Sequence, residues 1–176
     1  AALEYCMRKL NKGGRCGIVL PEGVLFRGGA YKRVKMELLR NFNVHTIISL
    51  PTGTFAHIAP KGGTGPKANL VFFDRTGPTK EIWYYELQGN YTKANPVKDE
   101  DLADCFEKWK NREISENSWI VPVKEVIERD YDLTARNPNR EKEVIYPEPE
   151  ELVESVFEKE KQILRILKEL RSILGE

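Results

Sequence analysis

The fold is decided by Val-His-Thr-Ile-Ile-Ser-Leu-Pro-Thr-Gly-Thr-Phe (residues 44–55) and by the later run Ala-Asn-Leu-Val-Phe-Phe-Asp (residues 68–74). Each stretch holds a short, continuous apolar run bounded by turn residues, which predicts a strand buried on both faces. The residues between them show no helical pattern. Two strands joined without a crossover helix are predicted to be antiparallel neighbours in one sheet.

The flanking segments extend this pattern in both directions. A further buried strand is predicted at residues 15–20, and helices at 3–10 and 31–42 alternate with the strands, which indicates an α/β fold. Residues 22–30 are predicted to be a loop, and the cations of the second helix a solvated face. Downstream we expect an aromatic strand at 81–87, a helix at 102–109 with Asp99 as its N-cap, an extended run at 119–122, a short helix at 123–128 and irregular chain at 131–138.

Composition limits the possible functions. The chain has 176 residues, with 28 basic and 27 acidic side chains and a net charge of +1. A protein that binds nucleic acid over its whole surface is therefore not indicated, and any DNA contact is expected to be a local patch or to be shared with a partner. No apolar run approaches the roughly 20 residues of a membrane span, and no signal peptide is visible. Without an initiator Met, the sequence is expected to start inside a larger protein.

Cysteine and histidine usage argues against disulfides and metal sites. The three cysteines, Cys6, Cys16 and Cys105, lie in apolar patterns and match no zinc spacing, so we interpret them as buried free thiols in a reducing cytoplasm. The two histidines, His45 and His57, have no carboxylate cluster near them in the sequence, and no metal site is predicted.

The candidate site is the crossing that carries Phe55. An aromatic ring, glycine-rich backbone and positive charge are the parts that would hold an extruded nucleobase, although a core aromatic in an ordinary loop is the alternative. The run Gly-Gly-Thr-Gly-Pro-Lys (62–67) also resembles a phosphate-binding loop. It lacks the Gly-Lys-Ser/Thr ending and precedes a strand instead of opening a helix, so nucleotide triphosphate binding is not favoured.

The last 30 residues have a different character. After an acidic, proline-containing start, apolar residues recur at steps of three and four, which predicts an amphipathic helix of about 25 residues, roughly 37 Å long. The stripe comprises Val153, Val156, Ile163, Leu167, Leu170 and Leu174. Docking to a partner, self-association as a coiled coil and packing against the same chain all remain open from the pattern alone.

Several blocks of the sequence, in order, resemble one family. Residues 12–26, the run at 45–51 followed by Phe55, residues 77–85 and the run Tyr-Asp-Leu at 131–133 are similar to the modification subunit of type I restriction-modification systems. Those subunits are adenine-specific DNA methyltransferases. The similarity covers most of residues 1–135.

The resemblance implies a fold and a set of site residues. It implies part of an α/β, Rossmann-like methyltransferase sheet, mostly parallel with an antiparallel last hairpin, in which S-adenosylmethionine donates a methyl group to the exocyclic amino group of a flipped adenine. Phe55 matches the family's Phe that packs on one face of that base. Residues 57–63 are longer than the usual compact loop. The base- and DNA-binding loop is expected to comprise Gly63, Gly65, Lys67 and Asn69.

One family motif is missing. Asp/Asn-Pro-Pro-Tyr/Phe, which holds the target amino group, occurs nowhere in the chain, and neither does an acidic, glycine-rich cofactor loop. We therefore expect the C-terminal part of the subunit, inactive and without tight S-adenosylmethionine binding when alone. The expected parts are the second half of the catalytic domain (1–90), a mixed extension (91–146) and an assembly helix (147–176).

The expected partners are DNA, a specificity subunit bound through the C-terminal helix, and a restriction subunit as a further candidate. The alternative function is a non-catalytic assembly module that displays a coiled-coil helix.

Overall fold

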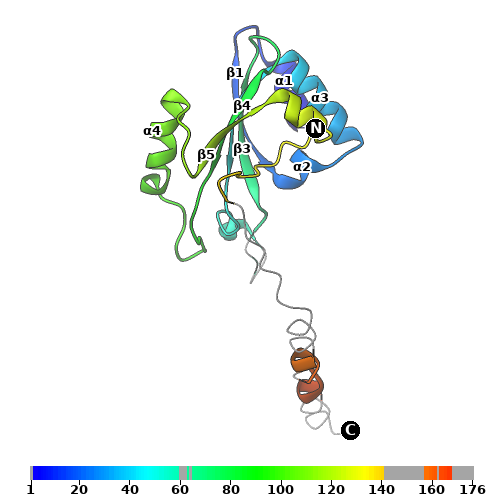
Figure 1. Cartoon of the computed structure of the whole chain (residues 1–176), viewed down its shortest axis with the longest axis vertical. Coiled ribbons are helices and arrows are strands. Elements are labelled where there is room, and N and C mark those ends of the chain that lie inside the picture. The colour runs from blue at the N-terminus through cyan, green and yellow to red at the C-terminus, as the bar shows by residue number, and fades with distance from the viewer. Residues whose placement is uncertain (1, 60–62, 64, 141–156, 162, 168–176) are drawn as a thin grey trace. The chain divides into compact units, whose positions relative to one another are not determined.

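The computed structural model describes residues 2–59, 63, 65–140, 157–161 and 163–167. The chain divides into two compact units, residues 1–141 and 142–176, and each is described by itself. The first unit is an α/β domain built on a five-stranded sheet with the order β1-β3-β2-β4-β5 (Figure 1). The strands are β1 (Arg15–Pro21), β2 (Asn43–Ser49), β3 (Ala68–Asp74), β4 (Glu81–Glu86) and β5 (Ser118–Pro122).

The predicted antiparallel pair is confirmed, with β2 and β3 as neighbours. β3 also pairs with β1 in antiparallel fashion, so β1 and β2 run in the same direction but are separated by β3. β2 and β4 are parallel, and β4 and β5 are antiparallel. The described sheet is therefore mixed instead of mostly parallel, because the returning strand is inserted between the two strands that a crossover helix connects.

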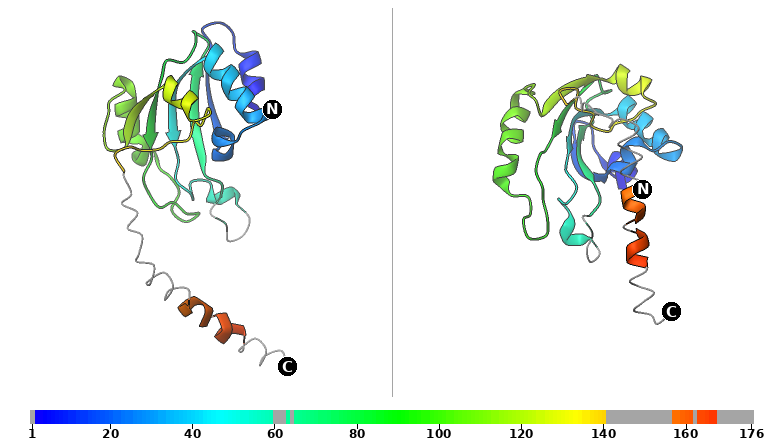
Figure 2. Two further views of the ribbon diagram at one scale, coloured as in Figure 1. Left: turned by 45° about the vertical axis from the view of Figure 1, so that its right-hand side comes forward. Right: turned by 60° about the horizontal axis from the view of Figure 1, so that its bottom comes forward.

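Helices cover the two faces of the sheet unequally. Figures 1 and 2 show α1 (Ala2–Lys9), α2 (Glu22–Phe26) and α3 (Ala30–Asn41) on one face, and α4 (Ala103–Asn111) on the other. The first face buries the larger apolar cluster, which includes Val71, Phe73 and the stacked rings of Tyr84 and Trp119. α5 (Val123–Glu128) follows β5 and contributes Val126 to that cluster. The second face buries a smaller, aromatic cluster around Trp83 and Tyr85.

The loop predicted at residues 22–30 is wrong in its first half, where α2 forms. The reason is a tertiary contact, since the ammonium group of Lys35 donates a hydrogen bond of 2.6 Å to the carbonyl oxygen of Leu25. Leu133 N–H donates to the same oxygen at 3.1 Å. Lys35 is only 1% exposed, so it is not part of the solvated face predicted for its helix.

The predicted cap at Asp99 is also wrong. A 3-10 turn, η2 (Asp99–Leu102), precedes α4, and Lys98 occupies the N-cap position of that turn. The carboxylate of Asp101 accepts a hydrogen bond of 2.8 Å from the backbone N–H of Lys98. The acidic run therefore contains the capping carboxylate, but two residues later than predicted.

The remaining predictions concern the segments after α4. The extended run at 119–122 is within β5, the short helix at 123–128 is α5, and residues 131–138 are irregular as expected. β5 pairs with β4 in the same sheet. Residues 118–122, which fall in the extension expected at 91–146, therefore form one sheet with strands from residues 1–90. All three cysteines are free thiols, with Cys105 buried and the other two half-buried.

The second unit is described only over two short helical segments, 157–161 and 163–167. Five large apolar side chains of these segments are about half exposed: Phe157, Ile163, Leu164, Ile166 and Leu167. The rest of the predicted C-terminal helix, including Val153, Val156, Leu170 and Leu174, lies outside the described residues. Within the described chain, no helix combines the length and the apolar character needed to cross a membrane.

Thr79 joins the end of α3 to the start of β2. Its backbone N–H donates to Leu39 O at 2.9 Å. Its buried hydroxyl donates to Phe42 O at 2.8 Å and accepts from Val44 N–H at 2.9 Å. A single side chain thus satisfies two backbone groups that the helix-to-strand connection would otherwise leave without partners.

Replacing this hydroxyl should be costly. Thr79→Val keeps the shape but leaves Phe42 O and Val44 N–H buried without partners, which should lower the free energy of unfolding by about 1–3 kcal/mol. Urea denaturation of the two proteins measures this difference. The exposed Thr52→Val variant is the matched control, and equal transition midpoints for Thr79→Val and the original chain would contradict the assignment.

Candidate functional site

The ends of three strands and the start of a fourth meet along one margin of the sheet. The backbone register places Pro21 opposite Ala68, and Ser49 opposite both Asn69 and Glu86. The last residues of β1 and β2 therefore lie beside the first residues of β3, and the last residues of β4 lie beside the end of β2. We call this margin the strand-end edge. In open α/β sheets, ligands bind outside the carboxyl ends of the strands, which makes this edge the first place to look for a site.

Phe55 lies at the strand-end edge, five residues after Leu50. It precedes a short 3-10 turn, η1 (Ala56–Ile58), and packs against the smaller apolar cluster while remaining partly exposed. Its ring centroid is 6.1 Å from that of the exposed His57, at an interplanar angle of 47°. Phe55 is therefore neither sealed in the core nor fully exposed to solvent.

The glycines around Phe55 serve close packing. Gly53 has φ +96°, and an added Cβ atom would lie 1.9 Å from the carbonyl oxygen of Tyr91. Gly65 has φ +78°, and its Cβ would lie 2.6 Å from the carbonyl oxygen of Phe55. Only glycine fits such positions. Gly63 is exposed, and residues 60–62 and 64 lie outside the described part of the chain.

Lys67 is engaged within the protein. Its ammonium group forms an ion pair of 2.7 Å with the carboxylate of Glu22, at the start of α2. The backbone N–H of Glu22 also donates to Lys67 O at 3.0 Å, so the two residues are joined twice. The predicted cation is present at the strand-end edge, but its charge is balanced by a partner that the sequence pattern did not reveal.

Asn69 is the second residue of β3 and not part of the loop. Its side chain is fully buried, and neither the amide oxygen nor the amide nitrogen has a hydrogen-bond partner among the described residues. Buried amides are almost always hydrogen-bonded, so this pair of free groups is unusual. Because both atoms are closed off from solvent, the described conformation does not present Asn69 to a ligand at the surface.

The turn after β1 does not fit a cofactor loop. The turn after β1 is short, with Pro21 capping α2 directly, and the Glu22 carboxylate is held by Lys67. S-adenosylmethionine binding needs an acidic, glycine-rich loop, and this turn does not fit that requirement. No group of three or more His, Cys, Asp or Glu side chains that could hold a metal ion occurs among the described residues.

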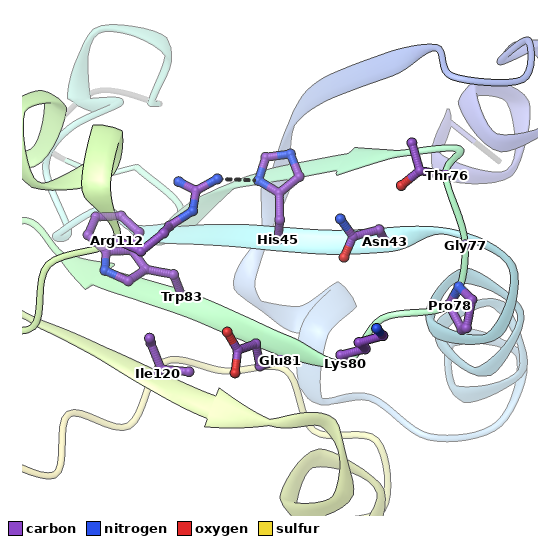
Figure 3. Close-up of a pocket in the computed structure, with 10 residues that line it drawn as sticks. All are labelled: Asn43, His45, Thr76, Gly77, Pro78, Lys80, Glu81, Trp83, Arg112 and Ile120. Carbon is purple, nitrogen blue, oxygen red and sulfur yellow. Dashed lines mark hydrogen bonds between the residues drawn. The ribbon is translucent and has the colours of Figure 1, made fainter.

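A separate cleft of about 740 Å³ lies at the opposite end of β2 (Figure 3). It is formed by β2, the β3–β4 turn, β4, the C-cap of α4 and β5. Sequence analysis did not predict it, because its walls come from five separated segments. Its lining includes Asn43, His45, Lys80, Trp83 and Arg112.

Two polar side chains of this cleft, Arg112 and His45, contact each other. Arg112 is in the left-handed region at φ 55°, and its guanidinium group lies 5.1 Å from the ring centroid of Trp109. The Nη2 atom donates to His45 Nδ1 at 3.0 Å, and Nη1 donates to Trp109 O at 3.0 Å (Figure 3 shows the contact with His45). Since Nδ1 accepts, the imidazole proton is on Nε2, which lies 4.0 Å from Asp74 Oδ2. The arrangement explains how α4 is fixed to the sheet.

The charge of Arg112 should affect the titration of His45. Burial and the neighbouring guanidinium group lower the pKa of His45, and Asp74 opposes them. Because the pKa in the folded state is below its unfolded value of about 6.5, the neutral imidazole stabilises the fold above pH 6.5, and this stabilisation decreases as the pH falls below it.

Arg112→Met should therefore raise the pKa of His45, which NMR titration of the imidazole resonances measures. A variant of the exposed Arg40, Arg40→Met, is the control for loss of one positive charge. With only two histidines in the chain, His57→Gln assigns the signals. An unchanged or lower pKa of His45 in Arg112→Met would contradict the contact.

Comparison with known proteins identifies the family. Residues 1–145 match the family described as N-6 DNA Methylase. The chain is 34% identical over 185 residues to the type I restriction enzyme EcoEI methylase subunit of Escherichia coli, covering 98% of this chain and 36% of that protein. It is 32% identical to the EcoKI methylase subunit of E. coli K12 over 57% of this chain and 20% of that protein.

Solved structures agree with these matches. One, described as the basis of complex assembly and conformational transition of the type I R-M system, superposes with a TM-score of 0.74 and 46% identity, over 99% of this chain and 39% of that one. A modification subunit of a putative type I restriction enzyme from Vibrio vulnificus YJ016 gives a TM-score of 0.71 and 37% identity, over 79% of this chain and 32% of that one. The chain thus spans between 20% and 39% of the length of these relatives. It belongs to the N-6 adenine DNA methylase family, as part of the methylase subunit of a type I restriction-modification system.

Proposed function

We propose that this chain supplies one wall of the slot that holds a swung-out adenine during N6 methylation of DNA. The observation that carries the proposal is the position of Phe55, a partly exposed ring on a closely packed turn at the strand-end edge. A base that has left the duplex loses its stacking, and an aromatic side chain restores it. The opposite wall, with the Asp/Asn-Pro-Pro-Tyr/Phe motif, would come from residues outside these 176.

The ammonium group of Lys67 at the strand-end edge can exchange its carboxylate partner for a DNA phosphate. The Lys67–Glu22 pair is about one-third exposed, and ion pairs of that kind stabilise a protein by only about 0–1 kcal/mol. A phosphate oxygen can therefore replace the carboxylate at little cost. This fits a chain whose net charge of +1 does not indicate a general affinity for nucleic acid.

Methyl transfer would need the complete subunit. In the family, S-adenosylmethionine supplies the methyl group when it is bound, and the turn after β1 here does not fit it. Transfer also requires the adenine amino group to be aligned with the donor, which half of a slot does not provide. The isolated chain is therefore expected to be inactive, and its contribution is to bind and orient the base.

Truncating Phe55 tests this contribution. In the complete subunit, Phe55→Ala should weaken binding of the extruded adenine by about 1–3 kcal/mol, through lost stacking. Methylation kinetics on a duplex that contains the target site measure this loss.

The control is Phe106→Ala on α4, which removes another exposed aromatic ring. Equal methylation by the Phe55 and Phe106 variants would remove Phe55 from the site.

The C-terminal segment is proposed to bind the specificity subunit, which reads the DNA sequence. The apolar side chains described at 157–161 and 163–167 are about half exposed, and a stripe of this kind needs a covering surface. Within 163–167, helical steps of 100° per residue place Ile163 and Leu167 about 40° apart, with Leu164 and Ile166 about 60° to either side of them. Self-association through the same face is the competing outcome.

Removing the segment separates these outcomes. A complete subunit that ends at Pro149 should lose co-purification with the specificity subunit while keeping the circular dichroism of the α/β domain. The matched control replaces only the exposed Lys159 with Gln in the full-length protein. Retained co-purification of the shortened subunit would contradict the proposal, and loss of a homodimer without loss of the specificity subunit would favour self-association.

A non-catalytic assembly module is the second candidate function, favoured by the half-exposed apolar side chains described at 157–161 and 163–167. The coding sequence upstream decides between them. An in-frame Asp/Asn-Pro-Pro-Tyr/Phe supports the enzyme, and a genuine start codon at residue 1 supports the module.

A further inference from the structure

The loop after β4 lies directly beside the loop that carries Phe55. β2 and β4 are parallel neighbours, so their C-terminal ends are adjacent, and Leu87 N–H donates to Ser49 O at 2.9 Å where both strands end. Just beyond this bond, the backbone of Tyr91 contacts Gly53. The contact is so close that a Cβ atom on Gly53 would lie 1.9 Å from Tyr91 O and 2.9 Å from its carbonyl carbon.

Tyr91 is itself held firmly. Its ring is 7% exposed and packs in the smaller apolar cluster together with Leu50 and Leu87. Its hydroxyl donates to Gln88 O at 3.1 Å, so the side chain closes a turn on its own loop. Gly89, at φ +146°, lies under the ring, and a Cβ atom there would be 2.6 Å from the tyrosine hydroxyl. The Tyr91 carbonyl is thus presented to Gly53 from an anchored turn.

The position of Gly53 is transmitted to Phe55 over two residues. Gly53 O accepts a hydrogen bond of 3.0 Å from Ala56 N–H, which closes the turn that contains Phe55. Phe55 O accepts from Ile58 N–H at 3.1 Å and lies against Gly65 on its other side. The backbone of Phe55 is therefore confined from both directions, by Tyr91 acting through Gly53 and by Gly65.

We propose that Tyr91 is a positioning residue for Phe55, acting through the close contact of its carbonyl group with Gly53. The β4–η2 loop then serves as a support that sets the direction of the stacking ring before DNA arrives. A ring fixed in advance loses less conformational entropy on binding than a mobile one. The positioning of Phe55 by Tyr91 is inferred from these contacts alone. That the positioned ring holds a base depends on the proposed function.

Hydrogen exchange of the backbone amides tests the support without any activity measurement. Gly53→Ala should force the two loops apart and raise the exchange rate of residues 51–59 about tenfold, while β2, β3 and β4 keep their protection. Gly13→Ala is the matched control, because Gly13 also has a positive φ, +73°, but a Cβ atom there would have open space. It separates the backbone strain of the substitution from the contact with Tyr91. Unchanged exchange at 51–59 in Gly53→Ala would overturn the proposal.

A double-mutant cycle identifies Tyr91 as the partner. Tyr91→Phe should retain protection of residues 51–59, since the ring packing and carbonyl group remain, whereas Tyr91→Ala should raise their exchange. In the Tyr91→Ala background, the carbonyl group of residue 91 is no longer anchored. Gly53→Ala should then change the logarithm of the exchange rate by less than half of the change that it causes in the original chain. Fully additive effects would overturn the assignment, and if Tyr91→Ala does not fold, the Gly53 and Gly13 variants still decide the question.

Activity of the complete subunit then separates this inference from the proposed function. Gly53→Ala should weaken binding of a duplex with a mismatched, easily extruded target adenine about as much as Phe55→Ala does, and leave S-adenosylmethionine affinity unchanged. If Phe55→Ala has no effect on methylation, the proposed function fails, while the exchange result still reports on the support. If Phe55→Ala impairs binding and Gly53→Ala does not, positioning by Tyr91 is wrong and the function stands.

Discussion

β3 pairs with β1 along one side and with β2 along the other, and the remaining features of the site depend on this double pairing. It brings Pro21 and Ser49 to the same end of the sheet, opposite Ala68 and Asn69. Glu22 and Lys67 meet there for the same reason, although 45 positions separate them in the chain. The loop from β2 to β3 must also turn back at this end, which is why Phe55 lies at the strand-end edge and not over a face of the sheet.

Close packing gives this edge its defined geometry. Glycine-rich segments are often interpreted as flexible, but Gly53 and Gly65 are found where two backbones approach too closely for any side chain. Such contacts restrict the loop, and restriction suits a wall against which a flat group must stack. Asn69 adds a different feature, an enclosed amide that has no hydrogen-bond partner among the described residues. An enclosed amide of that kind is destabilising unless another group, such as water, satisfies it.

The sequence predicted the elements better than the contacts between them. Apolar runs at 15–20, 44–50 and 69–74 identified three strands, and the absence of a helical pattern before residue 68 identified the antiparallel pair. α2 was missed because it depends on Lys35, a buried cation ten residues away from Leu25.

Of the candidate site, the sequence identified Phe55 and Lys67 as residues of interest. It placed Asn69 both in the strand at 69–74, where it lies, and in the binding loop. The contacts of Arg112 with His45 and of Tyr91 with Gly53 join residues 67 and 38 positions apart, and no local periodicity reports contacts of that range.

The central claim is that the ring at position 55 faces an extruded adenine, and fluorine NMR of the complete subunit tests it most directly. With 4-fluorophenylalanine at position 55, addition of a duplex containing the target adenine should shift the fluorine resonance, because a stacked purine places its ring current next to the label. The same duplex with an abasic site at the target should leave the resonance close to its position without DNA. Equal shifts with both duplexes, or no shift with either, would contradict the account.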